Sequence, residues 1–405
     1  MEITKKVLKS ILLLDRWVKS ENYCGWDPYD GLNSNLTSKL IRNEGLSILV
    51  IQVNLYSPIN IRPLLKIKKG HSNKALALFS NAYLNLYYVT KAPRFREDAL
   101  KLLEFLLNNN LYKNKDCFCC SSYYFTYIAP QHILNPNIPD IICVTECAKT
   151  FFKAYEVLGE DFYLNIAMKA CDYMLDKLFV CSNNSCYFKY TPLENSKIVF
   201  NVSALALSVL ANLLKYHYRS KIINVGEKVV GFLLAHQRKD GVWPYSLSLP
   251  SKRYYWQIDY HQGFIIDGLL DFIPYIREKD LKLRTIESIT KAVNFYIHKQ
   301  FDENGRSYYR YPYKYPIDIH NQAQGIITSL KLFNILKSRK YLQRAIRITK
   351  WTIDNMQDPR GYFYAHKYPW LTNKIPYMRW SQAWIMLALT MLFCNSFMNN
   401  EFKNL

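Results

Sequence analysis

The sequence predicts an all-α protein in which six helical hairpins close into a ring, an (α/α)6 toroid. A short pattern recurs every 56–73 residues along the chain. Helices that are apolar nearly all round alternate with helices that are apolar on one face only. In addition, the first amphipathic segment and the last apolar segment each lack a partner in sequence, so pairing these two segments would close the ring.

The recurring pattern places a small residue soon after a polar or aromatic stretch and follows it with an apolar helical run. Six positions show this pattern: Ala75, Ala148, Ala204, Gly263, Ala323 and Ala383. A helix that is apolar on all sides has to be buried. We therefore expect six inner helices that begin near these positions, the last of them at 381–394.

Between the apolar runs lie longer and more polar segments whose apolar residues repeat at helical spacing. They are expected at 94–109, 160–178, 219–236, 280–299 and 338–356, and the N-terminal segment at 3–19 completes the set. One-sided helices can face water, so these six should form an outer ring. An open solenoid is the alternative. The repeats leave no room for a second domain, so 1–405 is predicted to be one domain with almost no strand.

The composition indicates the chemistry of the partners. The chain has 405 residues, half of them hydrophobic, and a formal net charge of +21. This charge favours an anionic partner such as a uronic-acid glycan, a lipid-linked sugar or a membrane surface. On a membrane the protein would bind peripherally, without spanning the bilayer. The basic residues are spread along the chain without a polybasic tail, and no nucleic-acid partner is predicted. A well-solvated surface is the alternative interpretation.

The sequence also predicts a cytoplasmic protein without a cofactor. No apolar run reaches the about 20 residues that cross a bilayer, and the N-terminus lacks a signal-peptide core. The ten cysteines are expected to be reduced thiols. Neither Cys117–Cys120 nor the pair Cys181 and Cys186 has the second cysteine or histidine pair of a zinc site, so no metal is predicted.

The loops that lead into the inner helices should converge at one end of the ring and form a concave surface. Two of them contain the pattern Asp-x-His, and these copies lie 59 residues apart at equivalent repeat positions. Two carboxylates that face one cavity can divide acid and base roles, as glycosidic bond cleavage requires, and neighbouring histidines can move protons. Asp259, His261, Asp318 and His320 are therefore the predicted catalytic residues.

Two other interpretations of these residues stay open. Aspartate is a common N-cap of helices, and Asp259 with Gln262 resembles a capping box. Aspartate oxygen and histidine nitrogen also suit zinc or manganese.

Further polar and aromatic residues of the same loops are predicted to bind the substrate, because guanidinium groups hold carboxylates or phosphates and aromatic rings cover sugar faces. They are Asp27, Tyr29, Asp30, Arg62, Asp140, Trp243, Tyr245, Trp256, Tyr315, Tyr377, Arg379 and Trp380. Arg379 is the strongest candidate for an anion contact, since it precedes the last inner helix, whose N-terminal amides also attract anions. A salt bridge between repeats is the alternative role for Arg379, and packing is the alternative for the aromatic residues.

Six short motifs carry a resemblance to a known family. They are Trp26–Asn33, Asn60–Pro63, Asp240–Tyr245, Asp259–Phe264, Tyr315–His320 and Arg379–Trp384. Over nearly its whole length the chain resembles a family encoded in surface-polysaccharide gene clusters of bacteria and archaea. It is more distantly similar to six-hairpin glycosidases, including unsaturated glucuronyl hydrolases, and to N-acylglucosamine epimerases and uronate-acting lyases or epimerases. The resemblance implies a glycan substrate.

The leading hypothesis is a glycoside hydrolase, lyase or epimerase that acts on an acidic or phosphate-linked sugar. Gln237-x-x-x-Gly241-x-Trp243 also resembles the repeat motif of squalene-type cyclases, so an isoprenoid-binding cyclase or prenyltransferase-like α-barrel is an alternative. The Asp-x-Asp-Asp acid motif of those cyclases does not occur in the sequence. A glycan-binding scaffold without catalytic activity is a third possibility, and it predicts carboxylates that only cap helices and lie far apart.

Overall fold

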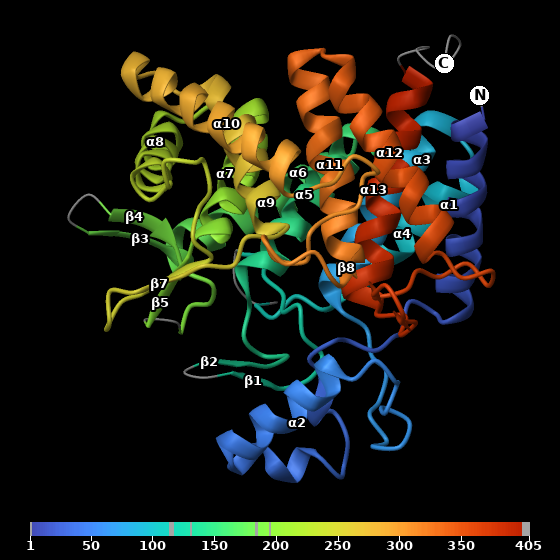
Figure 1. The fold of residues 1–405 in the computed structure, drawn as a ribbon. Helices are drawn as coiled ribbons and strands as arrows, with labels where there is room; N and C mark the ends of the chain where they lie inside the picture. The colour runs from blue at the N-terminus through green and yellow to red at the C-terminus, as the bar shows by residue number, and fades with distance from the viewer. Residues whose placement is uncertain (1, 113–116, 130–131, 183–184, 194–195, 399–405) are drawn as a thin grey trace.

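Six inner helices form a closed ring. The computed structural model describes residues 2–112, 117–129, 132–182, 185–193 and 196–398. Each inner helix packs against the next, and the last packs against the first (Figure 1). In ring order they are α3 (Asn73–Thr90), α5 (Ile141–Leu158), α7 (Phe200–Tyr216), α9 (His261–Phe272), α11 (Ile319–Leu336) and α13 (Ala383–Met398). The predicted all-α toroid is confirmed, and an open solenoid is excluded.

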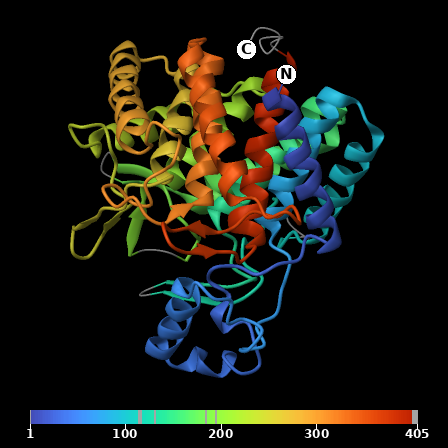
Figure 2. The ribbon, with the colours of Figure 1, turned by 45° about the vertical axis from the view of Figure 1, so that its right-hand side comes forward.

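Six outer helices cover this ring. They are α1 (Glu2–Ser20), α4 (Pro93–Asn108), α6 (Asp161–Tyr173), α8 (Ser220–Ala235), α10 (Lys279–Lys299) and α12 (Arg339–Met356). α1 packs against both α12 and α13, so the two ends of the chain meet (Figure 2). The division into two rings follows from the sequence: all residues from Phe200 to Ala211 of α7 are buried, whereas only one face of α12 is.

The turns after three outer helices show how the ring closes. A glycine with positive φ stands after α8, α10 and α12, at Gly241, Gly305 and Gly361. A Cβ atom at Gly241 would collide with the backbone of α10, and one at Gly305 with the backbone of α12. At Gly361 the collision would be with the backbone of Leu13 in α1. α1 therefore takes the place of the next outer helix after α12, although it is first in sequence.

A glutamine at the start of each of the last three inner helices holds the preceding turn. The side-chain Oε1 of Gln262 accepts the N–H of Trp243 at 2.9 Å, and its Nε2 donates to the Trp243 carbonyl at 2.9 Å. Gln382 binds Phe363 in the same two ways, both at 2.8 Å. Gln322 holds the corresponding turn of the repeat between them. These contacts connect consecutive hairpins at the end of the ring where the loops gather.

Short antiparallel strands occur in the loops, so the expectation of almost no strand needs a small correction. Two hairpins are β1–β2 (Tyr127–Ala129, His132–Leu134) and β3–β4 (Phe179–Ser182, Ser185–Phe188). Three-stranded sheets are β5–β6–β7 (Lys197–Val199, Ser246–Ser248, Tyr254–Tyr255) and β10–β9–β8 (Thr372–Asn373, His366–Lys367, Ile317–Asp318). The loops are long enough to pair with one another, and pairing satisfies their backbone groups.

A thirteenth α-helix, α2 (Glu44–Tyr56), lies outside the two rings and was not predicted. It is inserted between α1 and α3 and lies beyond the loops, at the end opposite the two termini (Figures 1 and 2). It packs against β1 and two 3-10 turns, η1 (Asp30–Leu32) and η2 (Ser38–Arg42). A third 3-10 turn, η4 (Ile273–Tyr275), follows α9, and π-helical turns, η3 (Met174–Leu178) and η5 (Met378–Gln382), adjoin α6 and α13.

One expectation about the cysteines was wrong. Cys181 and Cys186 face each other across β3 and β4 and form a disulfide. The tight hairpin brings the two thiols together, which residue spacing did not reveal.

Among the described helices, none has both the length and the apolar composition that a membrane span needs. The assignment of 1–405 to one domain stays a prediction.

We expect Gly361→Ala to lower the free energy of unfolding by about 1–3 kcal/mol, because alanine is strained at a φ of 113° and would push α1 away. Gly231→Ala in α8 is the matched control, since no atom lies near its added Cβ and alanine favours the helix by about 0.5–1 kcal/mol. Urea unfolding of both variants measures the difference. Similar stabilities for the two variants would contradict closure of the ring through α1.

Candidate functional site

A cavity of about 240 Å³ lies at the loop end of the ring and contains two of the predicted catalytic residues, Asp259 and Asp318. We call it the two-aspartate cavity. Its walls come from the loop after α1, the end of α2, and the loops that precede α9, α11 and α13. The lining residues are Pro28, Tyr29, Leu55, Tyr56, Gln257, Asp259, Tyr260, Tyr309, Arg310, Pro316, Asp318, His366, Tyr368, Asn373 and Trp380.

Asp259 combines a structural contact with a place on the cavity wall. Its Oδ1 accepts the backbone N–H of His261 at 3.1 Å and contacts Nδ1 of the same histidine at 2.6 Å. Its Oδ2 accepts a hydrogen bond from the side-chain amide of Gln257 at 2.6 Å. The carboxylate is thus held by three groups and orients the His261 ring. His261 itself does not line the cavity, since its ring packs between Tyr245 and Tyr260.

Asp318 occupies the equivalent position one repeat later but has different partners. Its Oδ1 caps α11 by accepting the backbone N–H of His320 at 2.8 Å, and it accepts the indole N–H of Trp380 at 3.2 Å. The Nε2 atom of His366 lies 3.4 Å from Oδ2. β8 pairs with β9 so that Asp318 stands opposite His366, and this register brings the two side chains together. Capping and exposure to the cavity therefore coexist in one residue.

His320 is separated from the cavity. Its ring stacks on Tyr260 at 4.1 Å and on Trp384 at 5.0 Å, and neither ring nitrogen has a partner among the described residues. Burial, together with the positive charges of Lys74 and Arg379, lowers the pKa of His320 well below its usual value. The ring is therefore neutral, and the expectation that His320 reaches a shared ligand is not met in this structure.

Aromatic rings line the cavity beside the two carboxylates. Tyr29 and Tyr260 each contact Trp380 edge to face, with ring centroids 5.9 and 5.7 Å away. Burial raises the pKa of Tyr260 well above its usual value, and the nearby Asp259 adds to this shift, so its phenol keeps its proton. Such rings offer flat apolar faces with polar tips, which suits a ligand that is apolar on one face and hydroxylated at its edges.

Arg310 is a cavity residue that the sequence analysis missed. Its guanidinium lies over the Tyr309 ring at 5.1 Å, and its buried Nε has no hydrogen-bond partner among the described residues. Burial lowers the pKa of Arg310, but Tyr309, Asp259 and two further tyrosines together raise it above its usual value, so the group stays charged. The run Tyr308–Tyr311, with an arginine among tyrosines in a loop before Asp318, was the available signal.

The predicted anion contact at Arg379 is an internal ion pair in the structure. Its Nε and Nη2 donate to the two carboxylate oxygens of Asp27 at 2.5 and 2.8 Å, and its guanidinium lies over the Tyr123 ring. Both residues are buried, and neither lines the two-aspartate cavity. The two parallel donors of the guanidinium, Nε and Nη2, are already bound to Asp27. This happens because ring closure brings the N-terminal loop against the start of α13.

A second buried ion pair takes up Arg62 and Asp30. The Nε of Arg62 donates to Asp30 Oδ1 at 2.8 Å, and Asn54 of α2 donates to the same oxygen. The Arg62 guanidinium also lies over the ring of Tyr377, which is fully buried. Burial raises the pKa of Asp30 to about 7, although Arg62 lowers it. These three predicted substrate-binding residues fasten α2 and the N-terminal loop to the ring instead of reaching the cavity.

The other predicted binding residues also lie outside the cavity lining. Asp140 is buried, caps α5 and accepts hydrogen bonds from Ser122. Trp243 is buried in the turn held by Gln262, and Tyr245 packs on His261. Trp256 and Tyr315 are exposed on the loops before α9 and α11. Among the predicted residues, the cavity therefore combines Tyr29, Asp259, Asp318 and Trp380.

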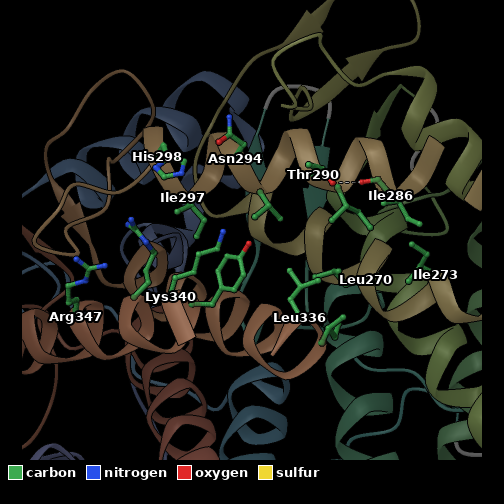
Figure 3. Close-up of a pocket in the computed structure, with 15 residues that line it drawn as sticks. Leu270, Ile273, Ile286, Thr290, Asn294, Ile297, His298, Leu336, Lys340 and Arg347 are labelled. Atoms are coloured by element: carbon green, nitrogen blue, oxygen red, sulfur yellow. Dashed lines mark hydrogen bonds between the residues drawn. The ribbon is translucent and has the colours of Figure 1, made fainter. Parts of the chain in front are cut away.

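A larger cavity of about 630 Å³ lies elsewhere, on the outer wall between α10 and α12 (Figure 3). Its walls are mostly apolar, and His298, Lys340 and Arg347 lie toward one end of it. No carboxylate is among its lining residues, so paired acid and base chemistry has no place there. In the part of the chain that the structure describes, no three metal-ligating side chains come together.

We expect the contribution of His320 to stability to fall as the pH drops below about 6.5, because unfolded His320 takes up a proton that the folded state excludes; Asp30, whose pKa is raised by burial, acts in the opposite direction. His320→Phe keeps an aromatic ring between Tyr260 and Trp384 and removes the titration. The free energy of unfolding of this variant minus that of the wild type should therefore increase between about pH 8 and about pH 5. Urea unfolding at several pH values measures this, and identical pH profiles would show that His320 is not held neutral.

The sequence matches no protein-family model, and no curated protein is similar enough to match it. Solved structures do match. A cellobiose 2-epimerase of Bacillus thermoamylovorans B4167 has a TM-score of 0.63 and 13% identity over 80% of this chain and 88% of that one. A GH76 α-mannanase of Bacteroides thetaiotaomicron has a TM-score of 0.64 and 12% identity over 81% and 88%.

An unsaturated glucuronyl hydrolase specific for heparin matches over the full length. Its TM-score is 0.63 at 13% identity, and the match covers 100% of this chain and 98% of that one. Identities this low show a shared fold and do not transfer an activity. The chain has the fold of the six-hairpin (α/α)6 toroid enzymes.

Proposed function

We propose that this protein is a carbohydrate-active enzyme that binds a saccharide in the two-aspartate cavity and uses Asp259 and Asp318 as its acid and base pair. The observation that carries this proposal is that equivalent aspartates of successive repeats line one cavity with aromatic walls. Similarity to an epimerase of cellobiose, a mannanase and a hydrolase specific for heparin supports the substrate class.

The contacts of the two aspartates suit them to chemistry on a bound sugar. Each carboxylate is held in one orientation by hydrogen-bond donors, and each lies beside an imidazole, His261 or His366. A carboxylate that keeps one geometry can transfer a proton to or from a fixed atom of the ligand, and this is how acid–base catalysis gains its efficiency. The different neighbours of Asp259 and Asp318 allow the two residues to take different roles.

Arg310 favours an acidic sugar or sugar phosphate as the substrate. It is the cavity-lining arginine, it has no ion-pair partner among the described residues, and a guanidinium binds a carboxylate or phosphate through two parallel hydrogen bonds. In this proposal Arg310 has the role that the sequence analysis gave to Arg379. The cavity volume of about 240 Å³ suits a ligand of about one sugar unit, with the rest of a glycan outside.

Replacing either catalytic carboxylate should remove turnover without unfolding the protein. We expect Asp259→Asn and Asp318→Asn each to reduce kcat by about 10²–10⁴-fold, since an amide still accepts the capping hydrogen bond but cannot exchange a proton. Heparin disaccharides, manno-oligosaccharides and cellobiose form the substrate panel, with products followed by mass spectrometry. Asp140→Asn is the matched control, because Asp140 caps a helix away from the cavity. Full activity of both cavity variants would refute the proposal.

Arg310→Lys should weaken binding of uronate-containing oligosaccharides about tenfold while leaving neutral ones unchanged, because lysine keeps the charge but loses the fork. Isothermal titration with matched acidic and neutral disaccharides measures both affinities. Arg306→Lys in the same loop is the control, since Arg306 pairs with Asp302 and does not line the cavity. Equal losses of affinity for acidic and neutral sugars would show that Arg310 shapes the cavity and does not bind the negative charge of the ligand.

A further inference from the structure

The exposed face of α2 is unusually apolar. Leu46, Leu49, Val53 and Tyr56 are 45%, 57%, 52% and 59% exposed. Their spacing of three and four residues places them in one stripe along the helix. Leu36, Ile41, Ile59 and Leu64 in the adjoining segments are also exposed large hydrophobic residues. We call these eight residues the α2 face.

The opposite side of α2 already packs on the protein. Ile51 is fully buried there, and Asn54 binds Asp30 of the ion pair with Arg62. α2 is thus apolar on nearly all sides, and a helix of this kind is normally covered on all sides. No described element covers the α2 face. Contiguous exposed apolar surface on a folded protein marks a place where something else binds.

Basic residues lie in the segments that precede and follow α2 in the chain. The segment 33–70 has six basic residues and one acidic residue, Glu44. Lys39, Arg42, Lys66 and Lys68 are exposed, and none of them forms an ion pair with a described residue. Two copies of this face would bring like charges together, which disfavours a dimer through it. A surface with fixed negative charges and an apolar layer beneath them would complement both properties.

We propose that the α2 face docks the protein on a lipid bilayer that contains anionic headgroups. The apolar stripe enters the boundary between headgroups and acyl chains, and the exposed lysine and arginine side chains of the adjoining segments bind lipid phosphates. α2 lies flat on the surface, as a helix of 13 residues is too short to span it. Docking in this way needs no change in the ring, because α2 already projects beyond the loops (Figures 1 and 2).

Docking also gives the two-aspartate cavity a defined position. Leu55 and Tyr56, the last residues of α2, line that cavity, so a docked protein holds the cavity beside the membrane. If the proposed function holds, a saccharide carried on a lipid anchor would reach Asp259 and Asp318 without leaving the membrane. The docking proposal itself does not depend on catalysis.

Co-sedimentation of the full chain with vesicles tests the proposal. We expect binding to phosphatidylcholine vesicles that contain phosphatidylglycerol, little binding to pure phosphatidylcholine, and weaker binding as salt is raised. The double variant Leu49→Ser, Val53→Ser should bind on the order of tenfold or more weakly, because it removes apolar area from the interface. Lys39→Gln and Arg42→Gln should each weaken binding roughly fivefold. All four residues are exposed, so circular dichroism and melting should be unchanged.

Leu283→Ser is the matched control, since Leu283 is a leucine of similar exposure on α10, away from α2. It should bind vesicles as the wild type does, and so should Asp318→Asn, which separates this test from that of the proposed function. Equal binding to charged and uncharged vesicles, or unchanged binding of the α2 variants, would overturn the proposal. So would a dimer in analytical ultracentrifugation that Leu49→Ser, Val53→Ser converts to monomer.

Discussion

Closure of the helical ring is the constraint on which the site depends. α1 fills the position of the outer helix after α12, with its backbone against Gly361, and the buried pair of Asp27 and Arg379 joins the N-terminal loop to the start of α13. The cavity needs this contact, because Tyr29 comes from the N-terminal loop and Trp380 from the last repeat. In an open solenoid these two walls would stand apart, and the aspartates between them would face water.

The same atoms serve the fold and the site. Asp318 caps α11, holds the Trp380 indole and faces the cavity, so its carboxylate is positioned by the contacts that stabilise its helix. Asp140 caps α5 in the same way but lies outside the cavity lining. Capping a helix and facing the cavity are therefore compatible, and what separates the two residues is the neighbouring loop. At Asp318 that loop brings His366 across a short sheet.

The insertion of α2 adds a layer to the loop end of the ring. The ion pair of Arg62 and Asp30 holds α2 in place through Asn54, which also binds Asp30. Buried charges are energetically costly unless each has a partner, and here both have one. The result is a helix that contributes Leu55 and Tyr56 to the cavity and exposes Leu46, Leu49 and Val53 in the stripe that ends at Tyr56. Without α2, the cavity would lack the part of its wall that Leu55 and Tyr56 form.

The architecture followed from sequence by itself, because the inner helices must be apolar all round and the outer ones need only one apolar face, and a period near 60 residues repeats this contrast. The equivalence of Asp259 and Asp318 followed from the same period.

The tertiary structure decided which charged side chains are free to contact a ligand. Arg62 and Arg379 look like anion contacts in sequence, yet their partners lie 32 and 352 residues away and bury them. Arg310 and His366 carry no repeat signal, and they reach the cavity only because irregular loops pair across repeats. Local spacing determines the helices, whereas burial and ion pairing depend on contacts between segments that the spacing does not connect.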